Sequence, residues 1–103
     1  MYEVRQTAIF AKWFGGLADV RIKDRIAARI SRIEVGNFGD SKSVGGSVRE
    51  LRIDVGPGYR IYFVLRGKTL VILLCGGDKG TQATDIELAK GYWNEYANDN
   101  GLK

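Results

Sequence analysis

The segment that decides the fold is residues 48–82, VRELRIDVGPGYRIYFVLRGKTLVILLCGGDKGTQ, which we interpret as three antiparallel strands joined by two tight turns. Two of its parts, 48–54 and 59–66, alternate in side-chain polarity, and this period of two is typical of strands that bury one face. The third part, 69–75, is apolar throughout, as expected of an interior strand covered on both faces. The rest of the chain must therefore cover this three-stranded meander.

The turns set the register of the predicted strands. Residues 66–69 suit a two-residue hairpin turn in which Gly67 adopts a positive φ. This turn predicts the opposed pairs Leu65–Leu70, Phe63–Ile72 and Arg60–Cys75.

A three-residue loop at 55–57 keeps the buried residues of both flanking strands on one face, because a slip of one residue would turn every apolar side chain outward. This loop places Arg52 opposite Arg60 and Glu50 opposite Tyr62. Two directly opposed arginines repel each other. They indicate either a solvated face in which Glu50 and Asp54 neutralise them or a site that binds an anion.

The other elements follow from periodicity and capping residues. Residues 2–5 form a short edge strand, and Thr7 and Asp19 begin two helices that make an antiparallel hairpin across the sheet. Residues 36–47 have no periodicity and are expected to form a surface loop. Thr81 begins a last helix that reaches about Ala97 and is followed by a frayed tail. The predicted fold is a single α+β domain, 1–103, whose four-stranded antiparallel sheet is packed by the helical hairpin and followed by the C-terminal helix.

Composition restricts the chemistry. The chain contains no histidine and one cysteine, which excludes Ser-His and Cys-His catalytic pairs and the usual zinc sites. We therefore expect neither a metal nor a cofactor. No apolar run approaches the length of a membrane span and Cys75 has no disulfide partner, so we expect a cytoplasmic protein without membrane contact. The net charge of +4 favours an anionic partner.

Three cations converge near one end of the predicted sheet. Arg52 and Arg60 are opposed, and Lys79 follows the last strand. Such a cluster suits a phosphodiester, because the arginine fork donates to two phosphate oxygens at once. It would also stabilise the charge that develops on a pentavalent phosphorane. Glu50 or Asp85 is a candidate base, and Lys79 or a tyrosine is a candidate proton donor.

A second basic surface lies on the predicted second helix. Its outer side carries five cations, offset by two carboxylates, Asp24 and Glu34. The cations are Arg21, Lys23, Arg25, Arg29 and Arg32. This side is interpreted either as a solvated helix face or as a surface that binds RNA or an acidic protein segment.

The element order and five motifs resemble the RelE/ParE superfamily of bacterial toxins, and more closely the HigB-like addiction-module killer proteins. The motifs are RQTAIFAKW (5–13), GNFGD (36–40), VRELRI (48–53), GPGYRIYF (56–63) and LLCGGDKGTQATDI (73–86). The resemblance implies the toxin of a type II toxin–antitoxin module, restrained by a helix-turn-helix antitoxin. It further implies a metal-independent endoribonuclease that cleaves mRNA on the ribosome and so inhibits translation. The alternative is the branch of the superfamily that poisons DNA gyrase without catalysis.

The same resemblance assigns roles to individual residues. The sheet arginine of the family matches Arg60, the basic residue of the preceding strand matches Arg52, and the one after the last strand matches Lys79. The predicted catalytic set is Arg52, Arg60, Lys79, Asp85 and Glu50, and the predicted RNA-binding set is Lys42, Arg49, Tyr62 and Arg66. Nuclease members often carry a tyrosine or histidine just after the last basic residue, whereas this chain has no ionisable aromatic side chain there until Tyr92.

Overall fold

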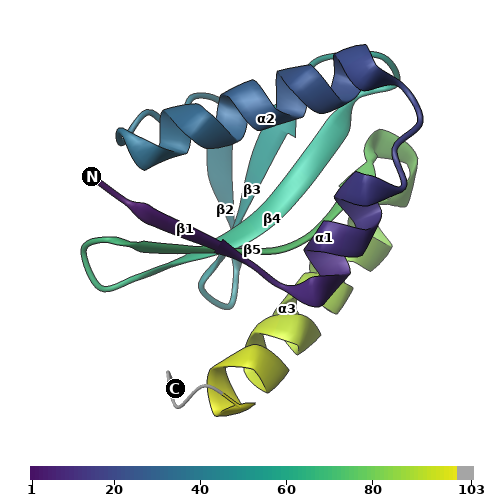
Figure 1. The fold of residues 1–103 in the computed structure, drawn as a ribbon. Coiled ribbons are helices and arrows are strands. Elements are labelled where there is room, and N and C mark those ends of the chain that lie inside the picture. Colours follow the sequence, from purple (N-terminus) through teal and green to yellow (C-terminus); the bar gives the residue numbers. More distant parts are fainter. Residues whose placement is uncertain (100–103) are drawn as a thin grey trace.

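The computed structural model describes residues 1–99. In chain order, the elements are β1 (Glu3–Gln6), α1 (Ala8–Gly15), α2 (Val20–Glu34), β2 (Ser41–Gly45), β3 (Val48–Ile53), β4 (Tyr59–Arg66), β5 (Leu70–Asp78), a 3₁₀ turn η1 (Lys79–Thr81) and α3 (Gln82–Asp99). The expected α+β architecture is therefore present, with a twisted sheet as the central layer (Figure 1).

The sheet has five strands in the order β1-β5-β4-β3-β2. The three strands predicted from the central segment are its middle, and β4 pairs antiparallel with both neighbours. Helices α1 and α2 cover one face, and α3 lies on the opposite face (Figure 1). The strands that carry the predicted site are thus held between two helical layers.

Each face of the sheet has its own hydrophobic core. On the α1–α2 face, Phe10, Ile26 and Ile33 pack against strand residues that include Leu51 and Ile61. On the α3 face, nine buried residues form the second core: Val48, Tyr62, Val64, Ile72, Leu74, Cys75, Ala89, Trp93 and Ala97. Burial raises the pKa of the Cys75 thiol to about 12, so this cysteine is a small core residue rather than a reactive thiolate.

The first two helix starts agree with the sequence predictions. The Thr7 hydroxyl accepts a 3.0 Å hydrogen bond from the Phe10 amide, and Asp19 Oδ1 accepts one of 2.9 Å from the Arg21 amide. α3 differs, because η1 precedes it and Asp78 caps that turn. α3 also extends two residues beyond the predicted end at Ala97. Residues 100–103 of the expected frayed tail lie outside the described part of the chain.

Two expectations about the sheet were wrong. The predicted surface loop contains β2, which pairs with β3 and makes the sheet five-stranded rather than four-stranded. The sheet is also mixed rather than antiparallel, because β1 pairs parallel to β5. β2 was missed because its sequence, SKSVG, lacks the alternation of apolar residues that marks a half-buried strand.

The predicted register was correct on one side of β4 and wrong on the other. Arg52 lies opposite Arg60 and Glu50 opposite Tyr62, as expected. On the β5 side, the turn is one residue longer than predicted, and an irregularity beside Tyr62 and Phe63 leaves one further residue of β5 unmatched. The observed pairs are Leu65–Val71, Phe63–Leu73 and Arg60–Gly77 instead of Leu65–Leu70, Phe63–Ile72 and Arg60–Cys75. Arg60 therefore lies opposite a glycine, and the carboxylate of Asp85 occupies the space where a side chain at that position would be.

Among the described residues, no helix is both long enough and apolar enough to span a bilayer.

Candidate functional site

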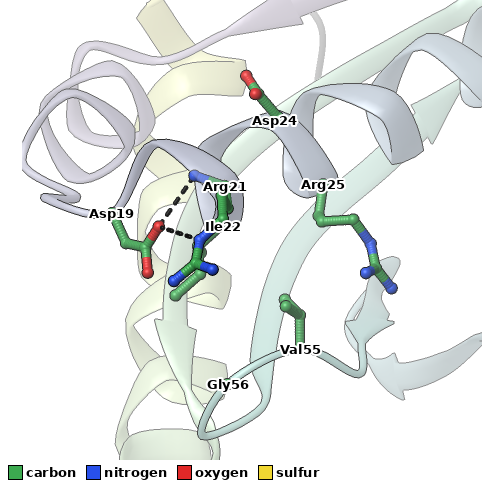
Figure 2. A pocket seen from close by; sticks show the side chains of 7 residues that line it. All are labelled: Asp19, Arg21, Ile22, Asp24, Arg25, Val55 and Gly56. Carbon is green, nitrogen blue, oxygen red and sulfur yellow. Dashed lines mark hydrogen bonds and ion pairs between the residues drawn. The ribbon is translucent and has the colours of Figure 1, made fainter.

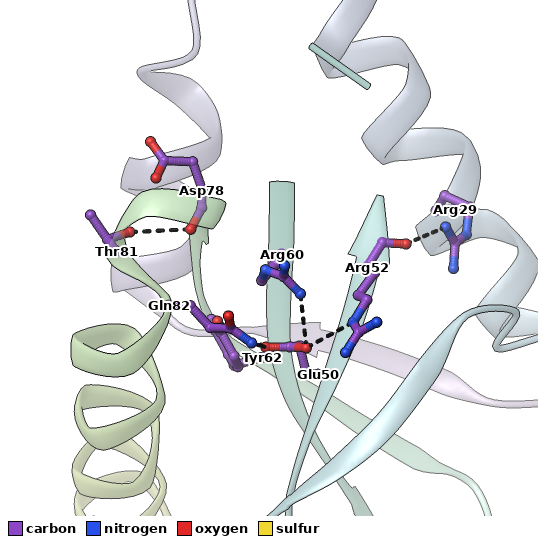
Figure 3. Close-up of polar contacts among 8 residues, drawn as sticks. All are labelled: Arg29, Glu50, Arg52, Arg60, Tyr62, Asp78, Thr81 and Gln82. Carbon is purple, nitrogen blue, oxygen red and sulfur yellow. Dashed lines mark hydrogen bonds and ion pairs between the residues drawn. The ribbon is translucent and has the colours of Figure 1, made fainter. Parts of the chain in front are cut away.

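A buried carboxylate organises the α3 face of the sheet. The side chain of Glu50 is 0% exposed and accepts from four donors (Figure 3). Its Oε1 accepts from Arg52 Nε at 3.2 Å and from Arg60 Nη1 at 3.1 Å. Its Oε2 accepts from the Tyr62 hydroxyl at 3.2 Å and from Gln82 Nε2 at 2.9 Å. We call these five side chains the Glu50 network.

The network keeps Glu50 ionised. Burial pushes the pKa of this carboxyl group upward, but the hydrogen bonds from Gln82 and Arg52, together with the charge of Arg60, outweigh that effect and lower the pKa. A carboxylate that has four donors and no solvent contact is poorly placed to accept a proton from a substrate. The structure instead places Glu50 beneath the two arginines, where it offsets their mutual repulsion.

Arg60 is the most strongly held of the predicted cations. It lies in the middle strand of the sheet, and its side chain is 14% exposed. One guanidinium nitrogen, Nη1, donates to Glu50, whereas the buried Nε has no hydrogen-bond partner among the described residues. A buried donor without a partner costs about 1–3 kcal/mol. The part of Arg60 that a ligand can reach is the 14% of its side chain that is exposed.

Arg60 lines a polar cavity of about 390 Å³, which we call the sheet pocket. The pocket opens between the end of β3, the turn that joins β3 to β4, and η1. Its lining residues are Asp40, Arg52, Ile53, Asp54, Gly56, Pro57, Gly58, Tyr59, Arg60 and Lys79. The three cations predicted from the sequence therefore share one cavity.

Lys79 reaches the pocket from η1. Its backbone amide donates a 3.0 Å hydrogen bond to the carbonyl of Gly58, which fixes the start of η1 against the β3–β4 turn. Asp78 Oδ1 accepts from the Gly80 amide at 2.8 Å and tightens the same turn. The backbone of Lys79 is thus held in place while its side chain is exposed.

Asp85 lies beside the pocket rather than in its lining. Its carboxylate accepts a hydrogen bond from the Thr81 hydroxyl at the start of α3. It also lies directly against Gly77, where an added Cβ would overlap Asp85 Oδ2. Because Gly77 is opposite Arg60 in the sheet, this carboxylate faces the same region as the Glu50 network.

The predicted RNA-binding residues do not form one surface. Lys42 is exposed and lies opposite Glu50 on β2, so it extends the basic face by one strand. Tyr62 is 0% exposed within the Glu50 network and presents no surface to a base. Arg49 belongs by strand alternation to the α1–α2 face. Arg66 lies over the ring of Trp93, 5.4 Å from its centroid, at the far end of β4.

Sequence reasoning missed two polar residues of this region, Gln82 and Asp40, and gave Asp54 only the role of neutralising the two opposed arginines. Gln82 completes the Glu50 network from the first position of α3, 32 residues away in sequence. Asp40 and Asp54 line the sheet pocket and supply exposed carboxylates there. Asp54 could be named from sequence because it follows the strand that carries Arg52, whereas nothing local pointed to Gln82 or Asp40.

A separate cavity of about 530 Å³ lies at the start of α2 (Figure 2). Its polar residues include Asp19, Arg21 and Arg25. Asp19 already accepts the hydrogen bond that caps α2 and lies 3.7 Å from Arg21 Nε. Arg25 extends from α2 alongside the turn that carries Val55 (Figure 2). This cavity shares Gly56 with the sheet pocket, so the two open on the same turn.

Over residues 1–99, no group of three or more His, Cys, Asp or Glu side chains is arranged to hold a metal ion.

Comparison with known proteins gives two findings. A family model described as phage derived protein Gp49-like matches residues 12–91, which is most of the chain. A Haemophilus influenzae protein, described as an uncharacterized protein, is 51% identical over 88 residues that cover 85% of this chain and 89% of that protein.

Proposed function

Because this chain belongs to the Gp49-like family of phage-derived proteins, which is associated with toxin–antitoxin modules and related to RelE-type toxins, we propose that it is the toxin of such a module. We further propose that it is a metal-independent endoribonuclease that cleaves mRNA on the ribosome and so inhibits translation. A cognate helix-turn-helix antitoxin would restrain it.

The observation that carries the nuclease proposal is the arrangement of cations around the sheet pocket. Arg52, Arg60 and Lys79 come from three different elements and line one cavity. The side chain of Arg60 is 14% exposed, and this exposed part is what a phosphate in the pocket would contact. The other cations would offset the negative charge of the phosphodiester.

The proposed reaction transfers phosphorus within the RNA. The 2′-oxygen forms a bond to phosphorus and the bond from phosphorus to the 5′-oxygen breaks, which leaves a 2′,3′-cyclic phosphate and a 5′-hydroxyl. Arg60 and Arg52 stabilise the extra negative charge of the phosphorane. Lys79 supplies the proton that the leaving 5′-oxygen takes up, because Lys79 is exposed and the arginines of the pocket do not release a proton in proteins.

The base that accepts the 2′-hydroxyl proton must be a group in reach of the pocket. Glu50 was the candidate from sequence, but its four donors give it the role of holding Arg52 and Arg60 in place. Asp40 lines the pocket and its carbonyl accepts a 2.9 Å hydrogen bond from the Arg52 amide, so we assign the accepting role to Asp40. Asp85 is not assigned this role, because its carboxylate lies against Gly77, opposite Arg60, and outside the lining of the pocket.

Arg60→Lys provides the test, because it retains the positive charge and removes the Nε donor. Arg60→Ala would in addition remove one of the two positive charges that Glu50 neutralises. Loss of the arginine fork should cost about 2–4 kcal/mol of transition-state stabilisation. We expect wild-type expression without antitoxin to arrest growth and to leave discrete mRNA ends in primer extension, and Arg60→Lys to lose both.

The matched control is Lys68→Ala, which removes a charge from the exposed β4–β5 turn. It should remain toxic. Folding of each variant is checked by circular dichroism. If Arg60→Lys folds and stays fully toxic while no mRNA ends appear, the nuclease proposal is wrong and poisoning of DNA gyrase becomes the explanation. Unimpaired growth at high wild-type expression would contradict the toxin assignment itself.

A further inference from the structure

A second basic cavity of about 230 Å³ lies under α2, next to the sheet pocket. This cavity is lined by Arg25, Ala28, Arg29, Arg32, Ile53 and Asp54. Two of these residues, Ile53 and Asp54, also line the sheet pocket. The two cavities therefore meet at the end of β3, where that strand leaves the sheet.

Three arginines form a row along the second cavity: Arg25, Arg29 and Arg32, which we call the arginine row. They stand four and three residues apart, so they share one stripe of the helix, and the row is about 10 Å long. Arg25 and Arg32 are exposed and form no ion pair among the described residues. Three neighbouring like charges repel one another unless an anion lies between them.

Arg29 fixes the row to the proposed site. Its Nη1 donates to the carbonyl of Arg52 at 2.6 Å, as Figure 3 shows, and its Nη2 donates to the carbonyl of Phe38 at 3.2 Å. Burial, followed by the nearby charge of Arg32, lowers the pKa of Arg29. The helix carrying Arg25 and Arg32 is thus tied directly to the strand that carries a pocket arginine.

The charges that line the two cavities indicate which class of ligand would bind there. The two cavities together are lined by six arginine and lysine side chains and by two carboxylates, Asp40 and Asp54. Arginine forks suit phosphate oxygens. A polymer with one phosphate per unit matches cations that recur in two adjacent cavities, whereas a single anion would occupy only one of them.

We infer that the arginine row is a second phosphate subsite for single-stranded RNA. A strand with one phosphate in the sheet pocket passes the end of β3 and places a further backbone phosphate between Arg25 and Arg32. This inference rests on the proposed function and extends it, because it assigns binding of the flanking RNA to α2. Asp54, where the two cavities meet, weakens this binding by repulsion.

The test measures RNA affinity against length. The probes are fluorescent single-stranded RNAs of two and ten nucleotides, made uncleavable by 2′-O-methyl groups, with affinity followed by anisotropy over a series of salt concentrations. The double variant Arg25→Ala/Arg32→Ala is compared with Lys12→Ala/Lys68→Ala, which removes the same charge from exposed positions outside both cavities. A second variant, Arg25→Gln/Arg32→Gln, retains more of each side-chain stem.

We expect both arginine variants to bind the ten-nucleotide RNA at least tenfold more weakly than the lysine control. The slope of log K against log salt should become shallower by about 0.7 for each phosphate that the variant no longer neutralises. Binding of the two-nucleotide RNA should be unchanged, because it fits the sheet pocket alone. Asp54→Asn should tighten binding of the longer RNA.

The inference is overturned if the arginine variants bind the ten-nucleotide RNA as the lysine control does. Poly-glutamate serves as a further probe. The inference is also overturned if the arginine variants lose affinity for poly-glutamate but not for RNA, since α2 would then dock an acidic protein segment. These outcomes leave the proposed function standing as long as Arg60→Lys weakens both RNAs. If wild-type protein binds neither RNA, the proposed function and this inference fail together.

Discussion

Glu50 and Arg60 form a diagonal ion pair across the β3–β4 ladder, in which Arg60 Nη1 donates to Glu50 Oε1 at 3.1 Å. The two residues are not directly opposed in the ladder: Glu50 lies opposite Tyr62, and Arg60 lies opposite Arg52. The diagonal pairing lets one carboxylate oxygen serve both arginines. It explains how two like charges occupy opposed positions in the middle of a sheet.

Glu50→Gln should destabilise the fold and remove part of its acid sensitivity. Replacing the charge leaves two arginines without their counterion, which should cost roughly 3–5 kcal/mol at pH 7. The pKa of Glu50 is lowered in the fold, so its contribution is present above its unfolded pKa, about 4.3, and is lost as pH falls through the folded pKa. The free energy of unfolding in urea, measured from pH 7 to pH 3, should therefore fall less steeply in the variant.

The matched control for this titration is Glu87→Gln on the exposed side of α3. It should keep the acid dependence of the wild type. If the free energy of unfolding falls equally steeply between pH 7 and pH 3 in wild type and Glu50→Gln, the Glu50 network does not govern acid stability.

Tyr62→Phe should reduce the loss of stability at high pH. Burial, followed by the charge of Glu50, raises the pKa of Tyr62. A raised pKa means that the contribution is complete below the unfolded value, about 10, and is lost as pH rises toward the folded value. The variant should lose about 1.5–3 kcal/mol at pH 7, the value of a hydrogen bond to a charged group. Its unfolding free energy should then decline less between pH 9 and pH 11.

Urea unfolding across that alkaline range, with phenol absorbance recorded in parallel, measures the effect. Tyr92→Phe serves as the control, since Tyr92 lies outside the Glu50 network. An alkaline decline of the same size in wild type and Tyr62→Phe would contradict the assignment.

Gly76→Ala and Gly77→Ala should each destabilise the protein by about 1–3 kcal/mol, because both faces of β5 are closely packed at this point. A Cβ at Gly76 would overlap the ring of Trp13, and one at Gly77 would overlap Asp85 Oδ2. Gly91→Ala is the control: it has nothing within 4 Å on α3 and should stabilise the helix by about 0.5–1 kcal/mol. Thermal melts of the three variants would test this, and equal melting temperatures would contradict it.

The fold was predictable wherever one face of an element is buried. β3 and β4 alternate in polarity, so only one register hides their apolar side chains, and that register was correct. β5 is apolar on both faces, so a slip of one or two residues against β4 still buries apolar side chains. Alternation therefore could not determine its register.

The clustering of the three cations was predictable from the sequence, but the hydrogen bonds that hold Arg52 and Arg60 were not. Arg52, Arg60 and Lys79 share a pocket, as strand order and the β3–β4 register suggested. Glu50 occupied a position that alternation assigns to solvent, and its burial depends on Gln82, which only the tertiary fold brings near. The contribution of α2 to the same region depends on two backbone carbonyls that accept from Arg29, and sequence patterns do not reveal such interactions.

The position of β5 between β1 and β4 has a consequence for synthesis of the chain. β1 is made first, yet its strand partner in the sheet begins only at Leu70. Until β5 has emerged from the ribosome, β1 has no strand to pair with, and one edge of β4 is unpaired. Lys79 follows still later, so the three cations can meet only after that residue has also emerged. A nascent chain that stops short of this point would carry neither a finished sheet nor a complete sheet pocket.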